Sequence, residues 1–252
     1  MNILMIVQYD GTDYNGWQRQ SNTPNTIQEI LETALARRIG EHCTLTAAGR
    51  TDAGVHALAM PCVFRCPELN IPPKRLTLAL NCILPSGIRV TDARLVADGF
   101  DPILSAVSKT YRYHVDNSAV PNVFARRYAW HIHRPLDTSA MRAAAAHFVG
   151  THDFKAFAAA GGSAKTSVRT IFALDVERHN GSVMIDITGN GFLYNMVRII
   201  TGSLVEVGLG KKQPSDIPAI IQSLDRKKAG QTAPASGLTM VEVVYDSSLL
   251  SL

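Results

Sequence analysis

Gly49-Arg-Thr-Asp-Ala-Gly-Val-His-Ala57 is the stretch of this 252-residue sequence that decides the fold. Two glycines, Gly49 and Gly54, bracket Arg50 and Asp52, with apolar segments on both sides. Glycine lets a backbone turn sharply or approach a ligand closely, so the two can bracket an acid presented at a cleft. On spacing alone, the plainer interpretation is a polar turn between two strands, because Gly and Asp are common turn residues.

The sequence around this stretch predicts a β-α-β-β-α-β order. Strands are predicted at residues 3–9, 45–48, 58–65 and 88–96, and a helix between Pro73 and Cys82. Apolar residues at helical spacing predict another helix after Thr26, with Glu29 completing a capping box and Gly40 ending the pattern. This order is consistent with a split βαβ, ferredoxin-like unit.

A second unit is predicted from about residue 105. Its strands are expected at residues 110–115, 128–132, 170–178, 182–188 and 238–245, and its helices from Asp137 or Thr138 to Phe148, at 192–208 and at 214–224. Gly150 is expected to terminate the first of these helices, and residues 158–167 to form the most mobile loop. We therefore expect an α+β protein with two domains, residues 1–104 and 105–252. Each would be a ferredoxin-like unit with an antiparallel sheet flanked by helices, with a cleft between them.

The composition is that of a globular protein. Hydrophobic residues make up 46% and charged residues 18%, which predicts a full core. No secretory signal is expected, and no run of 18 uninterrupted apolar residues predicts a membrane span. The cysteines form no CxxC pair, so we expect reduced core thiols in a cytoplasmic protein. They are Cys43, Cys62, Cys66 and Cys82.

The positive charge of the chain permits nucleic-acid binding without establishing it. The net charge is +4 and the pI is near 8.9. The basic clusters could follow a phosphate backbone if the fold brings them to one side. They are Arg37-Arg38, Lys74-Arg75, Arg126-Arg127, Lys211-Lys212 and Arg226-Lys227-Lys228.

Arg198 lies in a predicted helix that is apolar on nearly every face. Such a helix is buried, and a buried arginine needs an anionic partner. A core ion pair or a surface arginine whose stem alone is buried would also satisfy this pattern.

At the start of the second predicted unit, Lys109, Tyr111 and Tyr113 alternate along a strand and therefore share one face. An aromatic residue at such a position is often simply part of the core.

Taken together, these stretches resemble the TruA family of tRNA pseudouridine synthases. The resemblance covers the 49–57 stretch, the Gly191-Phe-Leu-Tyr-Asn-Met-Val-Arg198 stretch and the Lys109-Thr-Tyr-Arg-Tyr113 stretch. It extends to Tyr9-Asp-Gly-Thr with Gly16-Trp-Gln, to Gly150-Thr-His-Asp-Phe-Lys-Ala-Phe157 and to Val168-Arg-Thr-Ile171.

The resemblance implies an activity and a site. Asp52 would be the catalytic residue, Arg198 would pair with it and hold it ionised, and Tyr111 would stack on the target base. Arg50 would fill the position that the flipped base vacates or hold a phosphate, and Leu238 would form an apolar wall. The substrates implied are uridines 38, 39 and 40 in the anticodon stem-loop of tRNA, and the enzyme would be a homodimer whose cleft faces the tRNA.

Two segments depart from the family pattern. In Ala233-Pro-Ala-Ser-Gly-Leu238, Ala235 and Ser236 replace a proline and a histidine. In the segment that begins at Phe100, Pro102 and Ile103 replace an alanine and an arginine, so we expect an RNA contact of the family to be missing there.

Other functions are weighed against this one. The isomerisation needs no cofactor, and the sequence contains no phosphate-binding loop or dinucleotide fingerprint. His131, His133 and His152-Asp153 lack the spacing of a metal site, so no metal is expected. A catalytically idle RNA-binding relative stays open, as does an N-glycosidase that would use Asp10 or Asp13 as a second carboxylate.

Overall fold

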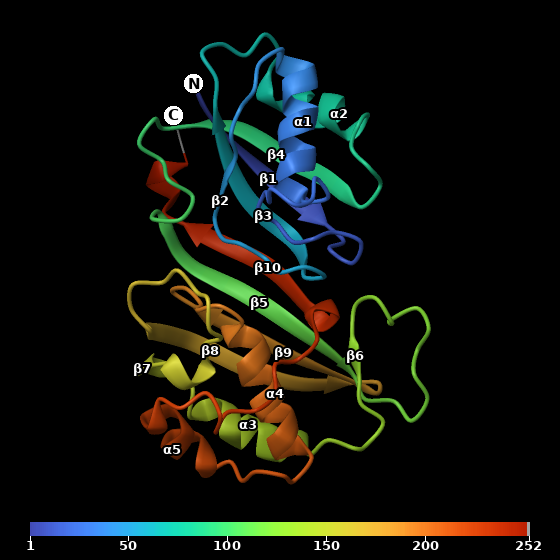
Figure 1. Ribbon diagram of the computed structural model, residues 1–252, viewed down its shortest axis with the longest axis vertical. Helices are drawn as coiled ribbons and strands as arrows, with labels where there is room; N and C mark the ends of the chain where they lie inside the picture. The colour runs from blue at the N-terminus through green and yellow to red at the C-terminus, as the bar shows by residue number, and fades with distance from the viewer. Residues whose placement is uncertain (251–252) are drawn as a thin grey trace. The chain divides into compact units, whose positions relative to one another are not determined.

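The computed structural model describes residues 1–250, which divide into two units (Figure 1). The first unit consists of Met1–Val107 together with the C-terminal segment from Thr239, and the second of Ser108–Leu238. Each unit contains a mostly antiparallel sheet and helices, so the predicted α+β class is confirmed. No helix in the described range is long and apolar enough to cross a membrane.

The sheet of the first unit has the strand order of a split βαβ arrangement. β1 (Asn2–Tyr9) lies between β4 (Ile88–Val96) and β3 (His56–Arg65) and is antiparallel to both. β2 (Thr46–Ala47) pairs with β3 in antiparallel orientation. β10 (Leu238–Tyr245) also pairs with β3, in parallel, through Thr239 and Met240.

β1 is apolar from Ile3 to Val7 because both faces of this part of the strand are covered. Ile3, Met5 and Val7 are fully buried, and on the opposite face Leu4 packs in a cluster with Phe100. The two helices of this unit, α1 (Ile27–Ile39) and α2 (Pro73–Asn81), lie side by side over the sheet (Figure 1).

The bounds of α1 are those that its sequence predicts. The Thr26 hydroxyl accepts a hydrogen bond from the backbone of Glu29, and Gly40 ends the helix with a φ of 90°. Only half of the predicted capping box forms. The Glu29 carboxylate lies 2.6 Å from the guanidinium of Arg19, and the amide of Thr26 donates to Pro24 instead.

The sheet of the second unit has the order β5-β9-β8-β7. Its strands are β5 (Ala106–Asp116), β7 (Gly150–Asp153), β8 (Val168–His179) and β9 (Ser182–Gly189), with a short β6 (Trp130–His131) parallel to β5. β8 and β9 form a hairpin that turns at Asn180 and Gly181, both with positive φ. α3 (Thr138–Ala146) packs against β8 and against α4 (Met196–Gly208), and α5 (Asp216–Ser223) follows α4.

Three sequence predictions, two in this unit and one in the first, are wrong in detail. The helix predicted from residue 192 begins only at Met196, because Asn195 has a left-handed φ of 59° that interrupts the helical path. α3 ends at Ala146, and Gly150 opens β7, which the sequence did not predict, instead of capping the helix. Cys82 is exposed, whereas the other three cysteines are buried as expected, and all four are free thiols.

Short 3₁₀ helices complete the chain. They are Lys155–Phe157, Ala235–Gly237 and Ser247–Leu249.

Candidate active site

Arg50 and Asp52 lie on the loop that connects β2 to β3 in the first unit. Arg50 is exposed and Asp52 is half-buried. The amide of Val55 donates to the carbonyl oxygen of Asp52 at 3.1 Å, and Gly54 has a φ of 80°, as the third position of a type II turn requires. The polar turn that the sequence suggests is therefore present, and it presents the carboxylate at its start.

The segment from Gly11 to Trp17 packs backbone against backbone on this loop. A Cβ atom on Gly16 would lie 2.7 Å from the carbonyl oxygen of Thr51, and one on Gly11 would lie 2.0 Å from that of Val55. Gly16 also has a φ of 88°, which favours glycine. Any side chain at either position would push the loop away, so both glycines are needed for the close contact.

Buried hydrogen bonds fix the residue next to Asp52. The hydroxyl groups of Tyr9 and Thr51 lie 2.8 Å apart, and the amide of Trp17 donates to the carbonyl oxygen of Thr51 at 3.0 Å. Tyr9, Trp17 and Thr51 are all buried. Thr51 is thus held on its side chain and on its backbone, which restricts where the carboxylate of Asp52 can point.

The far end of the loop is fixed through His56. Its Nδ1 atom lies 3.1 Å from the amide nitrogen of Gly11 and 3.2 Å from a carboxylate oxygen of Asp10. The same oxygen of Asp10 accepts hydrogen bonds from the amide and the hydroxyl of Thr12. Asp10 therefore acts here as a structural anion.

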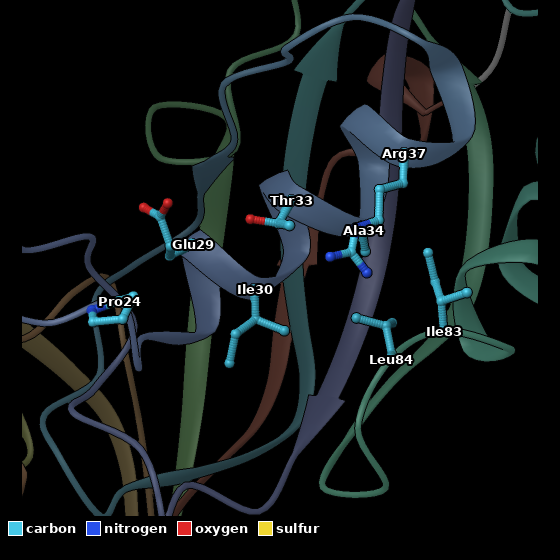
Figure 2. A pocket seen from close by; sticks show the side chains of 8 residues that line it. All are labelled: Pro24, Glu29, Ile30, Thr33, Ala34, Arg37, Ile83 and Leu84. Carbon is cyan, nitrogen blue, oxygen red and sulfur yellow. The ribbon is translucent and has the colours of Figure 1, made fainter.

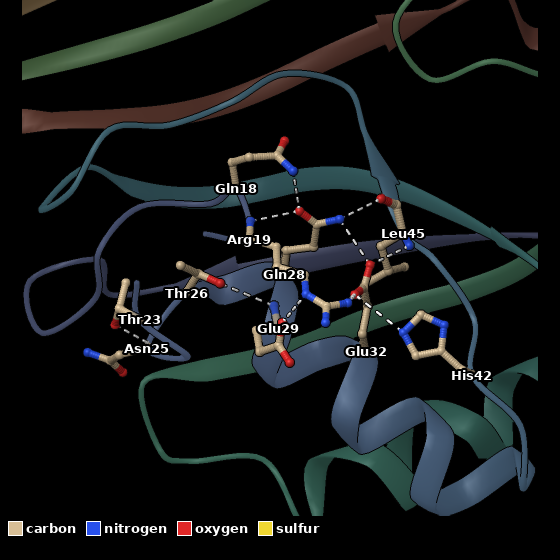
Figure 3. Close-up of polar contacts among 10 residues, drawn as sticks. All are labelled: Gln18, Arg19, Thr23, Asn25, Thr26, Gln28, Glu29, Glu32, His42 and Leu45. Atoms are coloured by element: carbon tan, nitrogen blue, oxygen red, sulfur yellow. Dashed lines mark hydrogen bonds and ion pairs between the residues drawn. The ribbon is translucent and has the colours of Figure 1, made fainter. Parts of the chain in front are cut away.

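A buried polar network on α1 supports the segment after Trp17 (Figure 3). The side-chain oxygen of Gln28 accepts from the Gln18 side chain at 2.8 Å and from the amide of Arg19 at 2.9 Å. Its amide nitrogen donates to Glu32 at 2.9 Å, and Glu32 in turn accepts from the amide of Leu45, just before β2. Because both Gln28 and Glu32 are buried, these bonds tie α1 to the segment after Trp17 and to the residue before β2.

A hollow elsewhere on α1 contains none of the predicted site residues. A pocket of about 270 Å³ lies between α1 and the turn after α2. Figure 2 shows the side chains that line it. Ile30, Ala34 and Leu84 form its apolar floor, and its one carboxylate, Glu29, already pairs with Arg19. This arrangement offers no catalytic group.

In the second unit, Tyr111 lies on β5 and is buried, as expected for the face that it shares with Lys109 and Tyr113. The ring of Phe192 packs edge-on against it, with ring centroids 5.3 Å apart. Burial lowers the pKa of Lys109, and the nearby charge of Arg169 lowers it further. This end of β5 therefore combines an aromatic ring with two cationic side chains.

Arg198 lies in the first turn of α4 and is half-buried. Its Nε atom donates to the carbonyl oxygen of Ala233, and a terminal nitrogen donates to the side chain of Asn195, each at 2.7 Å. Asn195 takes a left-handed conformation that its residue type tolerates. These two neutral partners fix the plane of the guanidinium group.

The segment that ends at Leu238 packs against both Arg198 and Tyr113. The hydroxyl of Tyr113 donates to the carbonyl oxygen of Pro234 at 2.8 Å, and burial raises the pKa of Tyr113. A Cβ atom on Gly237 would lie 2.5 Å from the Tyr113 ring, so only glycine fits there. Leu238 follows directly and is buried.

The structure thus groups the predicted residues into two sets. Arg50 and Asp52 share a loop of the first unit, and Tyr111, Arg198 and Leu238 belong to the second. Sequence reasoning missed Thr51 and Tyr9 as supports of the loop, and Asn195 as a partner of Arg198. Each of these three lies inside a stretch that resembles the family, which was the available signal.

Among residues 1–250, no group of three or more His, Cys, Asp or Glu side chains is arranged to hold a metal ion.

The two residues near Phe100 that depart from the family pattern both lie in the first unit. The carbonyl oxygen of Pro102 accepts a hydrogen bond from Tyr245 at 2.9 Å, and Ile103 is exposed.

The sequence of the chain matches a class of RNA-modifying enzymes. The sequence profile described as tRNA pseudouridine synthase matches residues 5–101 and 144–246. The chain belongs to this family.

Curated relatives match the chain over nearly its full length. The tRNA pseudouridine synthase A of Geotalea uraniireducens (strain Rf4) is 47% identical over 96% of this chain and 99% of its own. Those of Acetivibrio thermocellus and of Thermoanaerobacter sp. (strain X514) are 47% and 44% identical, each over 97% of this chain and 99% of their own. Among solved structures, the crystal structure of a Cbf5-Nop10-Gar1 complex aligns with 94% of this chain and 48% of its own, at 11% identity and a TM-score of 0.39.

Proposed function

We propose that this protein isomerises uridine to pseudouridine at positions 38, 39 and 40 in the anticodon stem-loop of tRNA. The observation that carries the proposal is the carboxylate of Asp52, on a loop that Tyr9, Gly11, Gly16 and Trp17 hold in place, in a chain of this family. As the sequence resemblance implies, the proposal includes a cytoplasmic homodimer.

The chemistry requires one carboxylate and a pocket for a turning base. The N1–C1′ bond breaks, the uracil turns, a C5–C1′ bond forms, and the proton lost from C5 is balanced by one gained at N1. No electrons are gained or lost. Asp52 acts either by attacking C1′ or by removing the C2′ proton. The target uridine is stacked in the stem-loop, so it must first be flipped out, which costs a few kcal/mol.

The remaining site residues bind and orient in this proposal. Arg198 pairs with Asp52, and its bonds to Ala233 and Asn195 support this role because they leave the fork of the guanidinium in a fixed plane. Tyr111 stacks on the flipped base, Leu238 forms an apolar wall, and Arg50 fills the vacated position in the RNA or holds a phosphate.

The test is Asp52→Asn, which keeps the shape of the side chain and removes its charge. With tRNA labelled with tritium at C5 of uridine, we expect the variant to release no tritium while its Kd for tRNA stays within about 3-fold of the original. Asp92→Asn is the matched control, because that carboxylate is exposed and lies 3.8 Å from Arg94 on β4. Substantial turnover by pure Asp52→Asn protein would refute the role of Asp52.

The same assay separates the other two functions. An idle RNA-binding relative would bind tRNA without releasing tritium even with Asp52 intact, and a glycosidase would release free uracil. The geometry argues against Asp10 as the second carboxylate of a glycosidase, because Asp10 is already engaged by Thr12 and His56.

A further inference from the structure

The loop between β5 and β6, residues 117–129, exposes large apolar side chains close together. Phe124 is 89% exposed, Val120 77% and Val123 62%. Single exposed apolar residues are normal on a protein surface, but a group within five residues marks a contact site. In Figure 1 this loop projects from the end of β5 beside β6.

The loop is held by a buried anion at its base. One carboxylate oxygen of Asp116 accepts from the amide and the hydroxyl of Ser118, and the other accepts from the amide of Asn122 at 2.9 Å. Burial by itself raises the pKa of Asp116, but these hydrogen bonds outweigh burial and lower it below its ordinary value. The exposed side chains are therefore displayed on a pre-organised loop.

The tip of the loop is also folded. The side-chain oxygen of Asn122 accepts a hydrogen bond from the amide of Phe124 at 2.9 Å. The backbone carbonyl oxygen of Asn122 accepts one from the amide of Ala125 at 3.0 Å. The amide of Tyr128 then donates to Ala125 at 2.8 Å. A rigid aromatic side chain loses little conformational entropy when it stacks on a ligand.

Apart from the buried Asp116 at its base, the loop and the residues after it carry no acidic side chain at any position up to Arg134. From residue 117 to 134 the sequence contains three arginines, Arg126, Arg127 and Arg134, and no aspartate or glutamate. Arg126 and Arg134 are exposed. An exposed aromatic ring among arginines matches the chemistry of an unpaired base with its phosphates.

We propose that the β5–β6 loop is a tRNA-binding element, in which Phe124 stacks on an exposed base of the tRNA and Arg126 contacts the adjacent phosphate. This inference rests on the proposed function for the identity of the RNA. A second copy of the chain fits less well, because a two-fold symmetric contact centred on this loop would bring the same arginines against each other.

The test compares substitutions in the loop with matched ones outside it. Phe124→Ala should weaken tRNA binding at least about 5-fold, since stacking contributes about 1–3 kcal/mol per base, and Phe124→Trp should retain it. Phe172→Ala is the control, because Phe172 is 50% exposed on β8 of the same unit. Arg126→Gln should lower the slope of log Kd against log salt by about 1, and Arg94→Gln, at an exposed position of β4 near Asp92, should not.

The outcomes distinguish the loop from the catalytic site. At saturating tRNA the single-turnover rate of Phe124→Ala should equal that of the original protein, because the loop acts in binding only. Unchanged Kd values for the loop variants would overturn the proposal. If these variants changed only the sedimentation coefficient of the protein, the loop would instead be a contact between protein copies, and the proposal would also be overturned. If the unsubstituted protein forms no pseudouridine, the proposed function fails, and the tRNA-binding comparison still decides the role of the loop.

Discussion

Asp52 shows how much one residue depends on partners that the local sequence does not reveal. The motif identifies the acid, and its glycines identify the turn. The hydroxyl of Tyr9 that holds Thr51 comes from a residue 42 positions earlier in the chain, so no periodicity or spacing rule could pair the two. The same applies to Arg198, whose need for a partner was predictable but whose bond to Ala233, 35 residues away, was not.

Tyr9→Phe tests whether the hydrogen bond between Tyr9 and Thr51 positions the β2–β3 loop and, with it, the carboxylate of Asp52. We expect kcat to fall about 10-fold with KM nearly unchanged, because a small displacement of the Asp52 carboxylate would be costly while the buried Tyr9 offers tRNA almost no surface. The loss of stability should be about 1 kcal/mol. Tyr245→Phe is the control, because its hydroxyl donates a hydrogen bond to the carbonyl oxygen of Pro102 within the same unit.

Both variants should be measured by thermal melting and by steady-state kinetics. Equal losses of kcat in the two would mean that the effect of Tyr9→Phe reflects general destabilisation. Thr51→Ser should stay close to the original activity because it keeps the hydroxyl, whereas Thr51→Val should resemble Tyr9→Phe.

At the scale of elements, the bounds of a helix or strand were predicted correctly where the residues that begin and end it lie next to it in the sequence. α1 has its predicted bounds because Thr26 and Gly40 act within one turn of the helix. The start of α4 was misplaced because the apolar pattern continues through residues 192–195, while the backbone turns at Asn195 to bring its side chain to Arg198. β7 was missed because four residues are too few for a pattern.

The packing of α4 against the segment before Leu238 gives a prediction at this scale. A Cβ atom on Gly202 would lie 1.8 Å from the carbonyl oxygen of Gln231, and one on Gly230 would lie 2.6 Å from the amide nitrogen of Ser203. Gly202→Ala must therefore push this segment away, and with it the carbonyl of Ala233 that holds Arg198. We expect a loss of at least about 1–3 kcal/mol in urea unfolding and a marked fall in kcat.

Gly99→Ala is the control for this substitution. Nothing lies within 4 Å of the added methyl group and the backbone there is not left-handed, so stability should be unchanged or rise by up to about 1 kcal/mol. A Gly202→Ala protein with full stability and activity would contradict the tight crossing of α4 and this segment.

At the scale of the whole molecule, the first unit is built from two distant parts of the sequence. β10 adds to β3, Met240 is fully buried, and Tyr245 packs against Phe100 with ring centroids 5.0 Å apart. A sequence pattern can predict this final strand, as it did here, but the strand's partner is specified by tertiary contacts alone. The C-terminal segment from Thr239 should therefore stabilise the first unit selectively.

Truncation after Leu238 tests this selectivity, and the two tryptophans of the chain report on it separately, because Trp17 belongs to the first unit and Trp130 to the second. In a Trp130→Phe background, the urea midpoint followed by Trp17 fluorescence should fall on truncation, with a loss above about 3 kcal/mol from the missing strand and its buried Met240. In a Trp17→Phe background, the midpoint followed by Trp130 should change much less. Equal shifts of both midpoints would mean that the two units unfold as one cooperative body and that β10 stabilises the whole chain.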